Sequence, residues 1–214
     1  MKPIEMASDE EIRYWKSIAE SHKGRYVEGS LGELGHVEIP YRRWHIHVGS
    51  SIVCRHDSSE HLAVSTIIVA RYLTLDHLSF RLVTEQNVLF VRLRKTLGLQ
   101  DIVVGHDDFD ETFLVKGNNP EKIGALFSRS SLSSSLVQIA KSQSQDEPFS
   151  YTATPSRDEL GKAFEGRLFN LELQLSGEAD DPSKRFSTAL EIVKGTLDGL
   201  AEYGSADEVD FYGA

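Results

Sequence analysis

The sequence predicts an α+β fold, in which a mainly antiparallel sheet carries helices at the N-terminus, in the middle and at the C-terminus of the chain. Strand-like stretches follow one another closely between residues 36 and 84. A parallel connection needs about a dozen residues between strands, so these strands must pair antiparallel. Apolar residues recur at helical spacing near both ends of the chain. Between these regions, residues 97–127 combine strand signals with a capped helix start.

An N-terminal helix is predicted over Ser8 to Lys23, because the helix opens with the capping-box pattern Ser-Asp-Glu-Glu. Its apolar face consists of Ile12, Trp15, Ile18 and Ala19. Gly24 ends the helix, and Arg25 to Glu28 can form a short strand. The glycine-rich residues 29–35 lack both the G-x-G-x-x-G and the Gly-Lys-Ser/Thr patterns of phosphate-binding loops, so they are predicted to form a flexible turn.

Consecutive strands are predicted from residue 36 to residue 84. Within residues 44–48, Trp, Ile and Val alternate with two histidines, which indicates one apolar and one polar face. Residues 61–74 are apolar on both faces, as in a central strand. Residues 78–83 alternate again, and residues 87–97 have the spacing of a helix.

Residues 97–127 have the clearest local pattern in the chain. Residues 101–105 are short, β-branched and closed by glycine, which predicts a buried strand. Residues 106–108 (His-Asp-Asp) are typical of a polar turn, and residues 109–116 alternate as a second strand. Asn119-Pro120 then predicts the cap and first position of a helix.

Residues 97–118 read LGLQDIVVGHDDFDETFLVKGN. This segment resembles one carried by a family of uncharacterised bacterial proteins, with the pattern LG-x-QDI-x-(V/I)G-x-x-x-FDE-x-F-x-(V/I)KGN. The matching residues are Leu97, Gly98, Gln100, Asp101, Ile102, Gly105, Phe109, Asp110, Glu111, Phe113, Lys116, Gly117 and Asn118. In that family an upstream strand begins with Tyr-Arg and an aromatic residue, as Tyr41-Arg42-Arg43-Trp44 does here. The likeness covers Arg25 to about Ile139, and it implies no activity and no catalytic residue.

The last third of the chain predicts two helices and two strands. Residues 128–142 are rich in serine and leucine, which favours a capped helix over a phosphorylation patch. Residues 142–155 are the best linker candidate and include a further strand-like stretch. Residues 167–177 alternate cleanly as a strand, and Asp181-Pro182 begins a helix with a continuous apolar stripe. Two glycines inside this helix, Gly195 and Gly199, would let it approach a neighbour closely.

The chain therefore divides into residues 1–142, predicted to form an α+β core domain, and residues 143–214, predicted to form a strand-plus-helix extension packed on the same core.

Composition narrows the class of protein. The net charge of −10 is unevenly placed, because residues 36–100 carry eight Lys/Arg against five Asp/Glu, whereas residues 101–214 carry ten against twenty-one. An acidic second half repels phosphate backbones, so nucleic acid is not an expected partner. The single cysteine, Cys54, rules out an intramolecular disulfide, and no apolar stretch has the length of a signal peptide core or a membrane span. These features predict a soluble, cytoplasmic protein with no membrane partner.

Four residues are candidate metal ligands. His45 and His47 are two positions apart on a predicted strand, so both point to the same face, as in metal-binding His-x-His pairs. His106 and Asp108 could complete the site from a nearby turn. The alternative is that the histidines lie on a solvent-facing side and the acidic turn caps itself.

No motif for a nucleophile, a phosphate loop or a calcium loop is present, and no catalytic residue or cofactor is assigned. The favoured hypothesis is a non-catalytic cytosolic binding or interaction domain. Its partner is left open between a second copy in a homodimer, another protein and a small ligand. The competing hypothesis is a divalent-metal-dependent hydrolase that uses the histidine pair and the acidic turn.

Overall fold

A single antiparallel sheet organises the protein in the computed structural model, which describes residues 9–29, 35–54, 62–84, 102–143, 149–156, 166–176 and 181–207. Its nine strands are β1 (Arg25–Val27), β2 (His36–Tyr41), β3 (Trp44–Cys54), β4 (Leu62–Thr74), β5 (Phe80–Thr84), β6 (Phe113–Gly117), β7 (Ser150–Pro155), β8 (Leu168–Leu175) and β9 (Ala206–Asp207). The order across the sheet is β1-β2-β3-β4-β8-β7-β5-β6, and β9 pairs with the end of β4. Every strand pair is antiparallel, so the predicted α+β class is confirmed.

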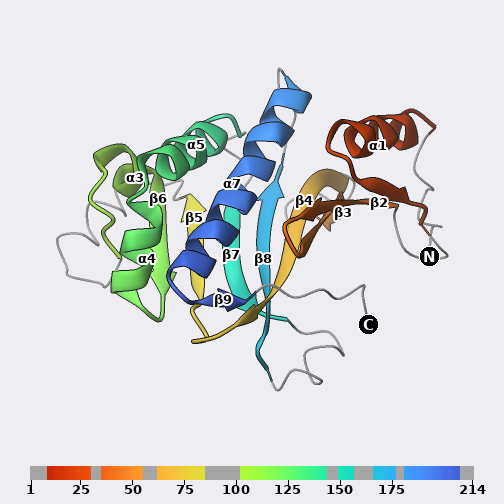
Figure 1. The fold of residues 1–214 in the computed structure, drawn as a ribbon. Coiled ribbons are helices and arrows are strands. Elements are labelled where there is room, and N and C mark those ends of the chain that lie inside the picture. Colours follow the sequence, from red (N-terminus) through yellow and green to blue (C-terminus); the bar gives the residue numbers. More distant parts are fainter. Residues whose placement is uncertain are drawn as a thin grey trace.

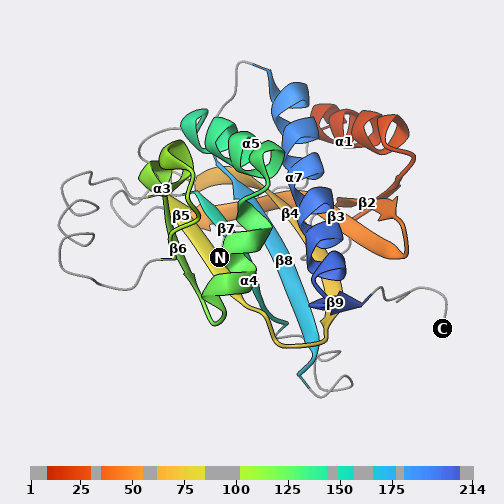
Figure 2. The same ribbon diagram turned by 60° about the vertical axis from the view of Figure 1, so that its left-hand side comes forward.

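The described helices cover one face of this sheet. They are α1 (Asp9–Ser21), α3 (Asp107–Thr112), α4 (Pro120–Phe127), α5 (Ser130–Lys141) and α7 (Pro182–Glu202). Figures 1 and 2 show α7 crossing the middle of the sheet, with α4 and α5 on one side of it and α1 on the other. The rings of His22, just after α1, and Phe186 of α7 lie 5.5 Å apart, so these two helices meet on the same face.

The core lies between the sheet and its helices. Trp44, Ile46 and Val48 of β3 are fully buried on the helix-covered face. The residues between them, His45 and His47, are half-buried and point to the opposite face, because successive strand residues alternate. The strand therefore divides as its alternation predicted, and both histidines lie on the face that the described helices leave open.

The part of the chain after residue 142 lies in the middle of the sheet. β8 pairs with β4 on one side and with β7 on the other, and β7 pairs with β5. In addition, α7 packs on both β4 and β8. The boundary expected near residue 142 thus separates stretches of sequence that share one sheet and one core.

Two helix starts form as the sequence predicts. The Asn119 side chain accepts a hydrogen bond from the Lys122 backbone N at 3.0 Å at the start of α4. The Asp181 side chain accepts one from the Lys184 backbone N at 2.9 Å at the start of α7. Each helix has proline at its first position, where the missing N–H leaves no bond unmade.

The predictions for residues 102–112 are wrong. Residues 102–105 form no strand, and the expected polar turn and the first half of the next strand are instead the helix α3. The Asp110 carboxylate accepts hydrogen bonds from the Val104 and Gly105 backbone N atoms at 2.9 and 2.8 Å, which folds the preceding loop back onto the helix. Only Phe109 of α3 is buried, so the helix has no apolar stripe that could have predicted it.

The predicted helix over residues 87–97 and most of the glycine-rich stretch lie outside the described residues. Among the described helices, none is both long enough and apolar enough to cross a membrane.

Candidate metal-binding site

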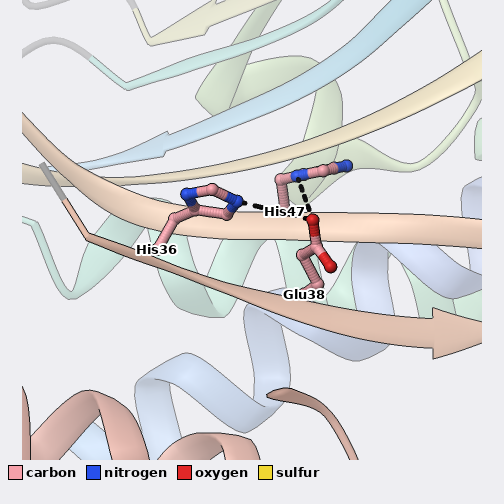
Figure 3. Close-up of side chains that lie close together, drawn as sticks. All are labelled: His36, Glu38 and His47. Carbon is pink, nitrogen blue, oxygen red and sulfur yellow. Dashed lines mark ion pairs between the residues drawn. The ribbon is translucent and has the colours of Figure 1, made fainter. Parts of the chain in front are cut away.

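The hairpin of β2 and β3 brings three potential ligands together on the face of the sheet that the described helices leave open. Glu38 and His47 are direct partners across the two strands, and His36 pairs with Gly49 one step along the same face. A two-residue connection joins Tyr41 to Trp44 and fixes this register. In Figure 3, dashed lines join one oxygen of the Glu38 carboxylate to a ring nitrogen of His36 and to a ring nitrogen of His47.

The three side chains converge on one small volume. Glu38 Oε1 lies 3.6 Å from His36 Nε2 and 4.0 Å from His47 Nδ1. One ligand atom from each residue lies within 4.8 Å of the others, and the two rings are 5.5 Å apart and tilted by 35°. Within the described part of the chain, no other set of three His, Cys, Asp or Glu residues gathers in this way.

The carboxylate is held in place from a third strand. Arg25 of β1 donates a hydrogen bond from Nε to Glu38 Oε2 at 2.5 Å, which leaves Oε1 directed at the imidazoles. The Glu38 side chain is only 8% exposed. Burial would raise the pKa of Glu38, but Arg25, followed by His47 and His36, brings the pKa below its usual value. Glu38 is therefore ionised at neutral pH.

His47 is held in its neutral form. Its side chain is 24% exposed, and burial is the main reason why its pKa falls to about 4. Glu38 opposes this shift, whereas His36, Arg71 and His45 add to it. A neutral imidazole keeps a lone pair on one ring nitrogen, which is the form that binds metals.

The dimensions suit a small divalent ion with little rearrangement. Bonds of about 2.1 Å in a tetrahedral site place ligand atoms about 3.4 Å apart, which is close to the 3.6 and 4.0 Å observed here. Side-chain movements of about 0.2 to 0.6 Å would close these two distances, and the two histidine atoms, which lie within 4.8 Å of each other, would have to approach by up to about 1.4 Å. Three protein ligands leave at least one coordination position for water or another ligand.

The four ligands predicted from sequence do not come together. His45 lies beside His47 on the same face of β3, opposite Pro40. His106 and Asp108 belong to α3 and its cap, next to β6, which is five strand spacings or about 24 Å from β3 along the sheet. Only His47 of the predicted set contributes to the group that the structure assembles.

His106 and Asp108 have structural roles at the start of α3. His106 Nε2 lies 2.8 Å from the Ser128 carbonyl oxygen, so this ring tethers the start of α3 to the end of α4. His106 and Asp108 also line an open hollow of about 510 Å³ between α3 and α5. Asp108 is exposed, and its backbone carbonyl accepts a hydrogen bond from Thr112 Oγ1 at 2.6 Å.

Sequence reasoning missed His36 and Glu38. Both belong to an alternating His-x-Glu pattern, but their relation to His47 depends on the hairpin register. The connection is Arg42-Arg43, which lacks the Asn-Gly or Asp-Gly signature of a two-residue turn, although Arg42 adopts a positive φ of 52°. With that turn assumed, counting outward would have paired Glu38 with His47.

Comparison with known proteins gives no relative. No protein-family model, no curated protein and no solved structure matches the chain at a significant level. The resemblance of residues 97–118 to a bacterial family therefore stays a prediction, and functional inference rests on the geometry of this chain alone.

Proposed function

We propose that the protein binds one divalent transition-metal ion through His36, Glu38 and His47. The observation that carries this proposal is the convergence of one ligand atom each from His36, Glu38 and His47 within 4.8 Å of one another on one hairpin. This proposal gives the favoured hypothesis of a non-catalytic binding domain a specific kind of ligand. Two imidazoles and one carboxylate suit Zn²⁺ and other divalent transition metals better than Mg²⁺ or Ca²⁺.

Two electrostatic features support metal binding at neutral pH. The lowered pKa of His47 means that no proton has to be displaced from its ring. The ion pair with Arg25 keeps Glu38 ionised and turns one oxygen toward the histidines. The positive charge of Arg25 also repels the metal ion. We therefore expect a moderate affinity for the metal, lower than that of a structural site in which four protein ligands surround the ion.

The test is titration of metal-free protein with Zn²⁺, Ni²⁺, Mn²⁺ and Mg²⁺ by calorimetry. We expect one Zn²⁺ per chain, weaker Mn²⁺ binding and no Mg²⁺ binding. His36→Ala, Glu38→Gln and His47→Ala should each weaken Zn²⁺ binding at least about tenfold.

His45→Ala is the matched control, because His45 is on the same strand and face but outside the converging group. Its Zn²⁺ affinity should stay close to that of the wild type. Zn²⁺ binding that survives both His36→Ala and Glu38→Gln would overturn the proposal.

A second candidate is hydrolysis by the bound metal. The open coordination position favours it, since catalytic zinc sites combine three protein ligands, including His₂Glu sets, with a water of lowered pKa. Release of nitrophenol from activated carboxylic and phosphate esters by Zn²⁺-loaded protein would support it. Equal rates for the wild type and Glu38→Gln, or for protein and free Zn²⁺, would leave metal binding as the function.

We also propose a cytoplasmic location, which the single cysteine supports because a reducing compartment needs no disulfide. Cell fractionation tests this, and recovery of the protein from an oxidising compartment would contradict it.

A further inference from the structure

A pair of like charges lies at the other end of the face that the described helices leave open. Arg81 of β5 and Lys116 of β6 are direct partners in the antiparallel register. Their neighbours Leu82 and Val115, which also pair, are buried in the core. Arg81 and Lys116 therefore point away from the helices, and both are exposed.

The two cations have no counter-charge in the described residues. No ion pair or hydrogen bond engages either side chain there, although the chain as a whole has a net charge of −10. Directly opposed side chains have Cβ atoms about 5 Å apart, and like charges in such a pair destabilise a sheet. An anion bound over Arg81 and Lys116 would relieve the repulsion between their charges.

The surrounding face adds a hydroxyl and one distant carboxylate. Thr152 of β7 pairs directly with Arg81 on the side away from Lys116. Glu172 of β8 follows Thr152 in the same row, two strand spacings or about 10 Å from Arg81. An anion that binds over Arg81 and Lys116 therefore has the hydroxyl of Thr152 as a neutral donor beside it. The nearest carboxylate in this row of side chains is that of Glu172, on the far side of Thr152.

The chemistry of the pair selects the kind of anion. A guanidinium offers a planar fork to two oxygens, and an ammonium adds a compact charge with three donors. A phosphate group has enough oxygens and charge to meet both at once, whereas a carboxylate has only two oxygens. We propose that Arg81 and Lys116, with Thr152 beside them, bind the phosphate group of a small phosphorylated ligand.

This site is independent of the proposed metal site. From β5 to β3 there are four strand spacings, or about 19 Å along the sheet. Substitutions at one site should leave ligand binding at the other site unchanged. The metal titration and the phosphate titration therefore test the two proposals separately.

The test is calorimetric titration of metal-free protein with inorganic phosphate and with glycerol phosphate, at constant ionic strength set by chloride. Sulfate and acetate serve as comparison anions. We expect saturable binding of both phosphates, weaker binding of sulfate and none of acetate. Arg81→Gln and Lys116→Gln should each weaken phosphate binding about tenfold. Glu172→Gln should tighten it, because a repelling carboxylate is removed.

Lys141→Gln is the matched control, since Lys141 is an exposed lysine at the end of α5, a helix on the opposite face of the sheet. Its phosphate affinity should be that of the wild type. Lys116→Glu, which converts the like pair into an opposite pair, should melt at a higher temperature than the wild type without phosphate and show no phosphate-dependent shift. The proposal would be overturned if titration with phosphate released no more heat than titration with chloride. It would also be overturned if the wild type and Lys116→Gln bound phosphate with equal affinity.

Discussion

Glu38 and His47 face each other across β2 and β3, with Glu38 Oε1 4.0 Å from His47 Nδ1, while the other oxygen of the same carboxylate holds Arg25. One carboxylate thus connects a permanent cation on β1 with a neutral base on β3. The direction of Glu38 Oε1, on which the proposed metal binding depends, is set by an ion pair outside the ligand group. This relationship can be tested from both of its ends.

Arg25→Gln should weaken Zn²⁺ binding about tenfold, because outer partners that orient a ligand typically contribute this much to metal affinity. The same change should raise the pKa of Glu38, since Arg25 is the main group that lowers it. Calorimetry at two pH values measures both effects. Arg43→Gln, a nearby exposed arginine in the hairpin connection, is the control and should leave Zn²⁺ affinity unchanged. A gain in affinity for Arg25→Gln would show that the charge of Arg25 matters more than its positioning of Glu38.

The stability of the metal-free protein should fall as the pH drops from about 6.5 toward 4. In this window the unfolded chain protonates His47, whereas the folded protein, in which the pKa of His47 is about 4, does not. Above pH 6.5 the residue is neutral in both states and contributes nothing to the pH dependence. The loss on acidification amounts to about 3 kcal/mol at most for this residue.

Urea denaturation of the wild type and His47→Asn across this range measures the effect. We expect a flatter stability profile for His47→Asn between pH 6.5 and 4.5. Parallel profiles for the two proteins would contradict the lowered pKa.

Lys122 connects the end of α7 to the turn after β4. Its Nζ donates to Asp76 Oδ2 at 2.6 Å and to the Tyr203 carbonyl at 3.2 Å, and lies 3.3 Å from the hydroxyl of the buried Ser205. Ser205 Oγ also donates to Asp76 Oδ2 at 2.9 Å. We expect Lys122→Met to lower the free energy of unfolding by about 1–2 kcal/mol, because Asp76 loses a charged partner. Chemical denaturation measures this loss.

The pair of Lys194 and Glu191 on α7 provides the comparison, with Glu191 exposed and Lys194 partly buried over the Tyr41 ring. Lys194→Met, which breaks an i,i+3 ion pair and a cation–π contact, should lower the free energy of unfolding by less than about 1 kcal/mol. Equal losses for the two lysine variants would mean that the Lys122 network adds nothing beyond a local ion pair on one helix.

Two glycines in α7 should respond in opposite ways to alanine. A Cβ on Gly195 would lie 4.0 Å from the nearest side-chain atom, Leu132 Cδ1, so Gly195→Ala should stabilise the protein by up to about 1 kcal/mol. A Cβ on Gly199 would overlap Leu126 Cδ1 in the contact with α4, so Gly199→Ala should destabilise it by about 1–3 kcal/mol. Thermal and urea unfolding of the two variants decides. A gain for Gly199→Ala equal to that for Gly195→Ala would show that α4 and α7 are loosely packed.

Local chemistry explains why parts of the fold were predictable. Asn119 and Asp181 cap their helices through hydrogen bonds to residues only three positions away. In β3, apolar and polar side chains alternate along the strand itself, so its two faces can be assigned from local sequence. By contrast, α3 depends on the Asp110 carboxylate bonding to a loop and on a single buried ring, neither of which leaves a periodic signal. Within residues 109–116, Glu111 stands in the apolar row and Leu114 in the polar row of the expected strand. This mismatch was a warning, and the observed strand begins only at Phe113.

The candidate site was only partly predictable for a related reason. His47 is recognisable from sequence as a polar residue on a strand whose other face is apolar. Its partners His36 and Glu38 come from another strand, and the turn between the two strands has no sequence signature. His106 and Asp108 were attractive in sequence because they are close to further acidic residues. Sheet order separates them from His47, and pairing between distant strands is not encoded locally.

The central position of β8 has a consequence for how the protein is made. Ile68 of β4 pairs with Leu173 of β8, which is 105 positions later in the chain. During translation the apolar β4 must wait, with one side unpaired, until the ribosome has released nearly the whole polypeptide. Newly made chains are therefore open to aggregation for about half of their synthesis, and their yield in the cell should depend on chaperones that shield this strand.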